Sequence, residues 1–142
     1  MKYQVCALLG LAGGWISHAF GGWDAALNTL VFFMATDYVT GLIVAGVFRR
    51  SDKSENGALE SRAGFKGLLR KGMTLAIVLV ACRLDILLGT DFVRDAAVIA
   101  FAANEALSIV ENAGLMGVPI PPVIANSIEV LQRKGKEEKH GE

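Results

Sequence analysis

A cluster of amide, hydroxyl and carboxyl side chains lies in an otherwise apolar stretch of the sequence near residue 108. The cluster repeats at steps of three to four residues, which places its members on one face of a helix. Ionisable groups on such a face are costly to expose to hydrocarbon, so the face must meet other helices, water or both. The pattern therefore fits either a hydrogen-bond network between helices or a face that lines an aqueous path. The members are Asn104, Glu105, Ser108, Glu111 and Asn112.

A lone carboxylate, Asp37, lies near the middle of a second apolar stretch. Burial disfavours the charged form of a carboxyl group, so Asp37 is expected to be neutral or paired. Arg83, in a third apolar stretch, is the candidate partner. The pair would be either a structural ion pair or a group that controls assembly or gating.

Sequence motifs for catalysis or metal binding are missing. Cys6 and Cys82 have no Cys-x-x-Cys or Cys/His spacing, which argues against a zinc site or a redox pair. The sequence has no Gly-x-Ser-x-Gly, no His-Glu-x-x-His and no phosphate-binding glycine loop. We therefore expect no enzyme activity, no metal and no cofactor. The 14 Lys and Arg residues balance 14 Asp and Glu residues, which argues against a nucleic-acid partner.

Four long stretches poor in charge must position these polar groups. Hydrophobic residues make up 53% of the 142 residues, and the mean hydropathy of +0.45 is high for a soluble domain. A helix that spans a membrane needs about 20 mostly apolar residues. The first stretch is slightly short and lacks a clean signal-peptide cleavage site, so we expect a retained helix there. The stretches cover about residues 5–20, 25–48, 72–89 and 96–117.

A soluble helical bundle would need a polar face on each helix. The stretch 25–48 has no such face, because Leu30 to Met34 cover every direction of a helix. A chain of this length cannot bury several helices of that kind in protein. The sequence therefore predicts an all-α membrane protein with three to four transmembrane helices and a C-terminal amphipathic helix.

Positive charges between the apolar stretches predict the orientation. Segment 49–71 and the tail after residue 131 are rich in Lys and Arg, whereas the links 20–25 and 90–95 hold only one such residue between them. Loops rich in Lys and Arg stay in the cytoplasm. Four spans then leave both termini inside. If residues 5–20 lie on the membrane or re-enter it, three spans remain and the N-terminus is outside.

Basic residues in the second half of the central loop recur at helical spacing. A short helix here would lie on the inner membrane surface, with its basic side chains toward lipid head groups. An ordinary solvated loop is the alternative. The membrane-surface residues would be Arg62, Lys66, Arg70 and Lys71.

The three prolines of the chain lie between Val118 and Val123, so the fourth helix is expected to end near Gly117. A further helix is predicted over residues 121–133, because Pro suits the first helical turn. Its apolar and polar residues fall on opposite faces, which is typical of a helix at the membrane interface. Residues 134–142 are predicted to form a charged cytoplasmic tail.

Two blocks of the sequence resemble the toxin-secretion/phage-lysis holin family (phage holin family 4-like). The first block is Asp-Tyr-Val-Thr-Gly-Leu-Ile at 37–43, which precedes the basic loop. The second and more specific block is Asn-Glu-Ala-Leu-Ser-Ile-Val-Glu-Asn-Ala at 104–113, before Gly-Val-Pro-Ile-Pro at 117–121. The resemblance covers about residues 25–131.

The resemblance implies a multi-pass protein of the inner (cytoplasmic) membrane of a host bacterium. Its partners would be membrane lipids and copies of itself, because holins assemble into homo-oligomeric holes. The holes would release an endolysin, or a toxin, without necessary direct contact, and lysis would follow. The resemblance implies no catalytic site. The alternatives are a small proton- or ion-coupled transporter that uses Asp37 or Glu105, and an accessory subunit of a larger complex.

Overall fold

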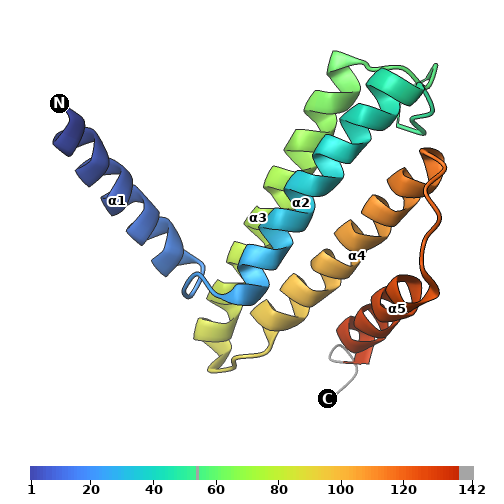
Figure 1. The fold of residues 1–142 in the computed structure, drawn as a ribbon. Coiled ribbons are helices and arrows are strands. Elements are labelled where there is room, and N and C mark those ends of the chain that lie inside the picture. The colour runs from blue at the N-terminus through green and yellow to red at the C-terminus, as the bar shows by residue number, and fades with distance from the viewer. Residues whose placement is uncertain (54, 138–142) are drawn as a thin grey trace.

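The computed structural model describes residues 1–53 and 55–137, and these residues form helices and no strands. Figure 1 shows the arrangement of the helices, which confirms the predicted all-α class. In chain order they are α1 (Lys2–Ala19), α2 (Ala25–Ile43) with a π-helical turn η1 (Val44–Phe48), α3 (Ser61–Leu88), α4 (Val93–Leu115) and α5 (Pro122–Glu137).

α2 and η1 continue into one another and form a helix over Ala25–Phe48. Within the described residues this is the one helix that is long and apolar enough to cross a membrane, with a mean hydropathy of 1.8 over its most apolar part. The predicted number of three to four spans therefore stays a prediction.

The core lies between α2, α3 and α4, which pack side by side (Figure 1). α2 contributes residues at steps of three and four, which is the spacing of one helix face. Each large apolar side chain that is fully buried there contributes roughly 1.5–3 kcal/mol. The buried core residues are Leu27, Leu30, Met34, Val78, Val98 and Ala102.

α1 stands away from the packed helices (Figure 1), and its apolar side chains are exposed. Leu11 is 73% exposed and Trp15 is 74% exposed. An apolar surface of this kind is not what a monomeric soluble protein presents to water. The environment of α1 must therefore come from outside this chain.

The turn between α3 and α4 is held by Asp85, a buried carboxylate at the end of α3. Its Oδ1 accepts hydrogen bonds from the Thr90 hydroxyl at 2.6 Å and from the Val93 N–H at 3.0 Å. Its Oδ2 accepts from the Arg94 N–H at 2.8 Å. Asp85 thus satisfies N–H groups of the first turn of α4 that have no partner within the helix.

The Arg94 side chain ties the link between α1 and α2 to the same end of the molecule. It donates to the carbonyl oxygen of Phe20 at 2.8 Å, to that of Gly22 at 3.2 Å and to the Asp24 carboxylate at 2.8 Å. The hydrogen bond from Arg94 holds the pKa of the Asp24 carboxyl below its ordinary value. Asp24 also caps α2, because it accepts from the Leu27 N–H at 2.8 Å.

The second half of the central loop is neither a separate surface helix nor a solvated loop, the two expected alternatives, because it continues into the 72–89 stretch as one helix. Ser61–Leu88 is one helix of 28 residues, because no proline interrupts it and its glycines are tolerated at modest cost. Its length of about 42 Å exceeds the ~30 Å core of a bilayer. The side chains of Arg62, Lys66 and Arg70 are exposed on its first turns.

The C-terminal helix forms as predicted and extends further. α5 runs from Pro122 to Glu137, so residues 134–137 of the predicted tail continue the helix. Residues 138–142 of that tail lie outside the described residues.

Replacing Asp85 with Ala should destabilise the turn between α3 and α4. The change leaves buried N–H groups of α4 without acceptors, which costs about 1–3 kcal/mol. We expect a lower midpoint of thermal unfolding in detergent. Asp91→Ala is the matched control, because Asp91 lies exposed in the same turn. Equal midpoints for the two variants would contradict the capping role.

Candidate polar centre between the helices

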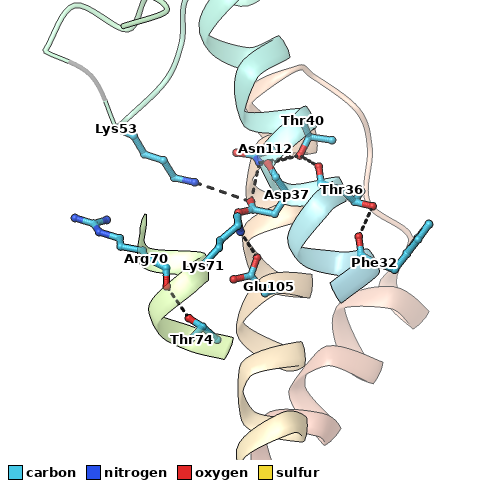
Figure 2. A network of polar contacts seen from close by, with 10 residues as sticks. All are labelled: Phe32, Thr36, Asp37, Thr40, Lys53, Arg70, Lys71, Thr74, Glu105 and Asn112. Atoms are coloured by element: carbon cyan, nitrogen blue, oxygen red, sulfur yellow. Dashed lines mark hydrogen bonds and ion pairs between the residues drawn. The ribbon is translucent and has the colours of Figure 1, made fainter. Parts of the chain in front are cut away.

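Charged side chains from three helices meet at the end of the packed body that carries the 49–60 loop (Figure 2). The Lys71 ammonium of α3 donates to Oδ2 of Asp37 on α2 at 2.7 Å, and also to the carboxylate of Glu105 on α4. The exposed fractions of these side chains are 14% for Lys71, 6% for Asp37 and 11% for Glu105. One ammonium therefore bridges two nearly buried carboxylates.

The helices place these groups on the stripes that form the core. Asp37 follows the buried Met34 by three residues, and Glu105 follows the buried Ala102 by three. Lys71 precedes the buried Val78 by seven residues, which is two helical turns. The three polar groups thus continue the apolar core toward one end of the molecule.

Asn112 joins α4 to α2 beside the bridge (Figure 2). Its amide nitrogen donates to Oδ1 of Asp37 at 3.1 Å, to the Thr40 hydroxyl oxygen at 2.9 Å and to the Asp37 carbonyl oxygen at 3.3 Å. The Thr40 hydroxyl in turn donates to the carbonyl oxygen of Thr36 at 2.8 Å. Asn112 is 5% exposed, so the network satisfies a polar side chain that is buried.

The charges of Lys71, Asp37 and Glu105 do not sum to zero, and a lysine of the loop lies close enough to compensate. Two carboxylates share one buried ammonium, which leaves one negative charge when all three groups are ionised. The Lys53 ammonium lies 3.9 Å from Oδ1 of Asp37, and its side chain is 56% exposed. Lys53 thus supplies a second cation from the solvent side, which lowers the cost of the excess charge.

A cavity of about 370 Å³ opens beside the bridge between α2, α3, α4 and the loop. Tyr38 lines it and lies against two glycines of α3: a Cβ atom on Gly64 would be 3.6 Å from the Tyr38 hydroxyl, and one on Gly67 would be 4.0 Å from its ring. Asn104 and Ser108 line the same cavity. The polar centre is therefore next to a space large enough for several water molecules.

The structure brings together most, not all, of the residues predicted for a polar network. Asp37, Glu105 and Asn112 are in direct contact through hydrogen bonds or the Lys71 bridge. Asn104 and Ser108 face the large cavity, and the exposed Glu111 lines a smaller one. All of these residues border one of the two cavities, and Asp37, Glu105 and Asn112 are buried there as well.

Arg83 is not the partner of Asp37, as the sequence had suggested. It lies exposed on α3, about 18 Å along the helix axis from Lys71. Lys71 was predicted at the membrane surface, but its side chain points inward to the two carboxylates. The signal that could have identified Lys71 is its two-turn spacing from the apolar core stripe of α3.

The fold and this centre define a small helical protein that pairs its charges between helices and turns many apolar side chains outward. Residues 14–133 match the bacteriophage holin family, and the chain belongs to that family. This confirms the resemblance drawn from the sequence, indicates a membrane protein and suggests a non-enzymatic role.

Relatives of known sequence support the assignment. A probable holin of Bacillus phage phi105 is 33% identical over 107 residues, which are 75% of this chain and 73% of the relative. An uncharacterized protein of Listeria innocua is 37% identical over 90% of this chain and 88% of its own length. An uncharacterized 14.9 kDa protein of Clostridium perfringens is 38% identical over 89% of each chain. No solved structure matches the chain.

Replacing Lys71 with Met should strongly destabilise the packed helices. The change leaves two buried carboxylates without their shared cation, which costs about 3–5 kcal/mol. We expect a large fall in the thermal midpoint in detergent, and its recovery when Asp37→Asn and Glu105→Gln are added. Lys66→Met, on the exposed face of the same helix, is the control. A loss no larger than that of Lys66→Met would show that the bridge contributes little.

Proposed function

We propose that this protein is a holin. It accumulates in the cytoplasmic membrane of a host bacterium, crosses it several times, and assembles with copies of itself into holes that release an endolysin or a toxin. The family assignment and the phage relative support this function. The observation that carries it is the distribution of polarity, with charges paired inside and large apolar side chains outside.

This distribution is explained if lipid surrounds the faces of the helices that point away from the packed core. Leu11 of α1, Phe32 of α2 and Leu87 of α3 are 73%, 66% and 80% exposed. Water would make such a surface unfavourable, whereas hydrocarbon would not. The helix of residues 25–48 is about 36 Å long and α4 is about 34 Å long, so each can cross a ~30 Å core.

The basic end of the molecule would face the cytoplasm. Arg49, Arg50 and Lys53 of the loop and the first turns of α3 carry a cluster of exposed cations, whereas the turn between α3 and α4 at the opposite end is held by Arg94, Asp24 and Asp85. Loops rich in Lys and Arg stay inside. Because α3 is longer than the hydrocarbon core, its exposed Arg62 and Lys66 can reach lipid head groups.

The polar centre gives a physical basis for a delayed opening. In a single subunit, Lys71 and Asn112 satisfy Asp37 and Glu105 between the helices. As the density of subunits rises, association between subunits competes with these internal contacts. Beyond a threshold, subunits expose polar groups to a common water-filled lumen. Because moving one charge through the membrane field is worth about 2.3 kcal/mol per 100 mV, loss of the membrane potential can shift this balance.

Expression of the chain with a cytoplasmic reporter enzyme tests the holin function. We expect sudden appearance of the reporter outside the cell after a delay. Phe32→Lys, which places a charge on an exposed apolar position of α2, should prevent release. The cavity beside Asp37 and Glu105 favours one rival, a small transporter, which predicts gradual ion flux without passage of protein. If expression of this chain alone causes neither ion flux nor release of the reporter, an accessory subunit of a larger complex is favoured instead.

Neutralising the carboxylates of the centre should advance the time of release. Asp37→Asn and Glu105→Gln each weaken charged hydrogen bonds worth about 1.5–3 kcal/mol, which makes the closed arrangement easier to leave. The measurement is the delay between induction and lysis at equal protein level. Asp91→Asn, exposed at the opposite end, should leave the delay unchanged. Unchanged delays in both centre variants would remove these groups from the trigger.

A further inference from the structure

α5 runs back along α4 instead of leaving it (Figure 1). Gly117, with φ of 81°, and the following proline-containing link reverse the chain direction after α4. Close contact is made near the end of α5, where a Cβ atom on Gly135 would lie 3.3 Å from both Cα and Cβ of Ala100. The two helices therefore form an antiparallel hairpin.

The hairpin uses a face of α4 that is separate from the polar centre. Ala102 belongs to the core with α2 and α3. The next residue, Ala103, points about 100° away from Ala102 around the helix and is nevertheless only 1% exposed. Ala100 and Ala103 are neighbours on one face of α4, and Gly135 contacts Ala100. α5 thus covers this second face.

α5 turns both charged and apolar side chains away from α4, and most of its charges lie in its last two turns. Ile128 and Gly135, two turns apart, are its buried residues. Arg133 is 72% exposed and forms an ion pair with Glu129 at 2.6 Å. The other exposed residues of the helix include Asn126, Lys134 and Lys136, together with the apolar Val123 and Val130, which are 66% and 57% exposed.

The depth of these cations decides what can surround them. Ala100 lies about 22 Å along the axis from the cytoplasmic end of α4 at Leu115. In a lone subunit that spans the membrane, the basic end of α5 would face hydrocarbon at that depth, which is unfavourable. In a water-filled hole the same side chains would be hydrated while Ile128 and Gly135 stay on α4.

We propose that α5, folded back on α4, lines the lumen of the hole and places its charged C-terminal turns in the water. The inference rests on the proposed holin function and deepens it. It assigns part of the lining to α5, which covers a face of α4 that is separate from the polar centre.

A disulfide that locks the hairpin tests the proposal. The double variant Ala100→Cys and Gly135→Cys, with Cys6→Ser and Cys82→Ala, places two Cβ atoms near the spacing of a disulfide. The full chain is reconstituted in liposomes that contain fluorescent dextran, and release is compared before and after reduction, with each single variant as control. We expect an intrachain cross-link and dextran release within twofold of the reduced protein.

Two results would overturn the proposal: no intrachain cross-link under oxidation, or a cross-linked protein that releases at least tenfold less dextran until it is reduced. The second result would mean that α5 must leave α4 for a hole to open. If the unmodified chain releases neither dextran nor a small dye, the holin function itself fails, and the lining role fails with it.

Ion selectivity of the smallest openings in a planar bilayer tests the lining directly. Lys134→Glu with Lys136→Glu should shift the ratio of chloride to potassium permeability at least twofold toward potassium. Arg62→Glu with Lys66→Glu, on the first turns of α3, is the matched pair at another exposed site. A shift no larger than that of the matched pair would contradict a lumen lined by α5.

Discussion

The arrangement of α2, α3 and α4 depends on one constraint: charges that lie among apolar helices must be paired within the protein. Lys71 meets this requirement for Asp37 and Glu105 at once, so each of the three helices contributes one member of a single bridge. A pair could satisfy two helices and leave the third free to slide. The three-way bridge fixes the relative depth of all three helices, because Lys71 can reach both carboxylates only in this register, and losing Lys71 leaves two buried negative charges.

α4 packs against α2, α3 and α5, so it is the helix that joins the other packed helices. One face carries Ala102 into the core and Glu105 into the bridge, and another face is covered by α5. At its first turn the backbone is capped by Asp85, while the Arg94 side chain holds the link before α2. A rearrangement that frees α4 from α2 and α3 must therefore break the contacts of Glu105 and Asn112 with Lys71, Asp37 and Thr40. Such a helix is well suited to hold a closed state that is lost cooperatively.

The sequence was sufficient to predict the helices and most of the polar centre, because these follow from periodicity. Asp37, Glu105 and Asn112 stand out as polar residues at helical spacing in apolar surroundings. Lys71 did not stand out, because it is the last residue of the basic segment 49–71. Its role depends on one carboxylate 34 residues before it and another 34 residues after it. Arg83 failed as a partner because charge complementarity says nothing about depth along two packed helices.

Amphipathic pattern alone also could not decide where α5 lies. An apolar stripe fits a membrane surface and the face of a neighbouring helix equally well. The contact of Gly135 with Ala100 distinguishes the two, because it requires a close approach of backbones that lipid does not demand. The periodicity predicted the helix, and only the tertiary packing showed its partner.

The two sequence blocks that resemble the holin family turn out to be the two sides of one contact. In the first block, Asp37 accepts from the Asn112 amide and Thr40 accepts from the same group. In the second block, Glu105 and Asn112 approach that surface from α4, with Lys71 between. The blocks are separated by more than sixty residues in sequence and adjacent in space. Their residue types follow from the need to bury a carboxylate between helices, so the family likeness is carried by the same contact that joins α2, α3 and α4.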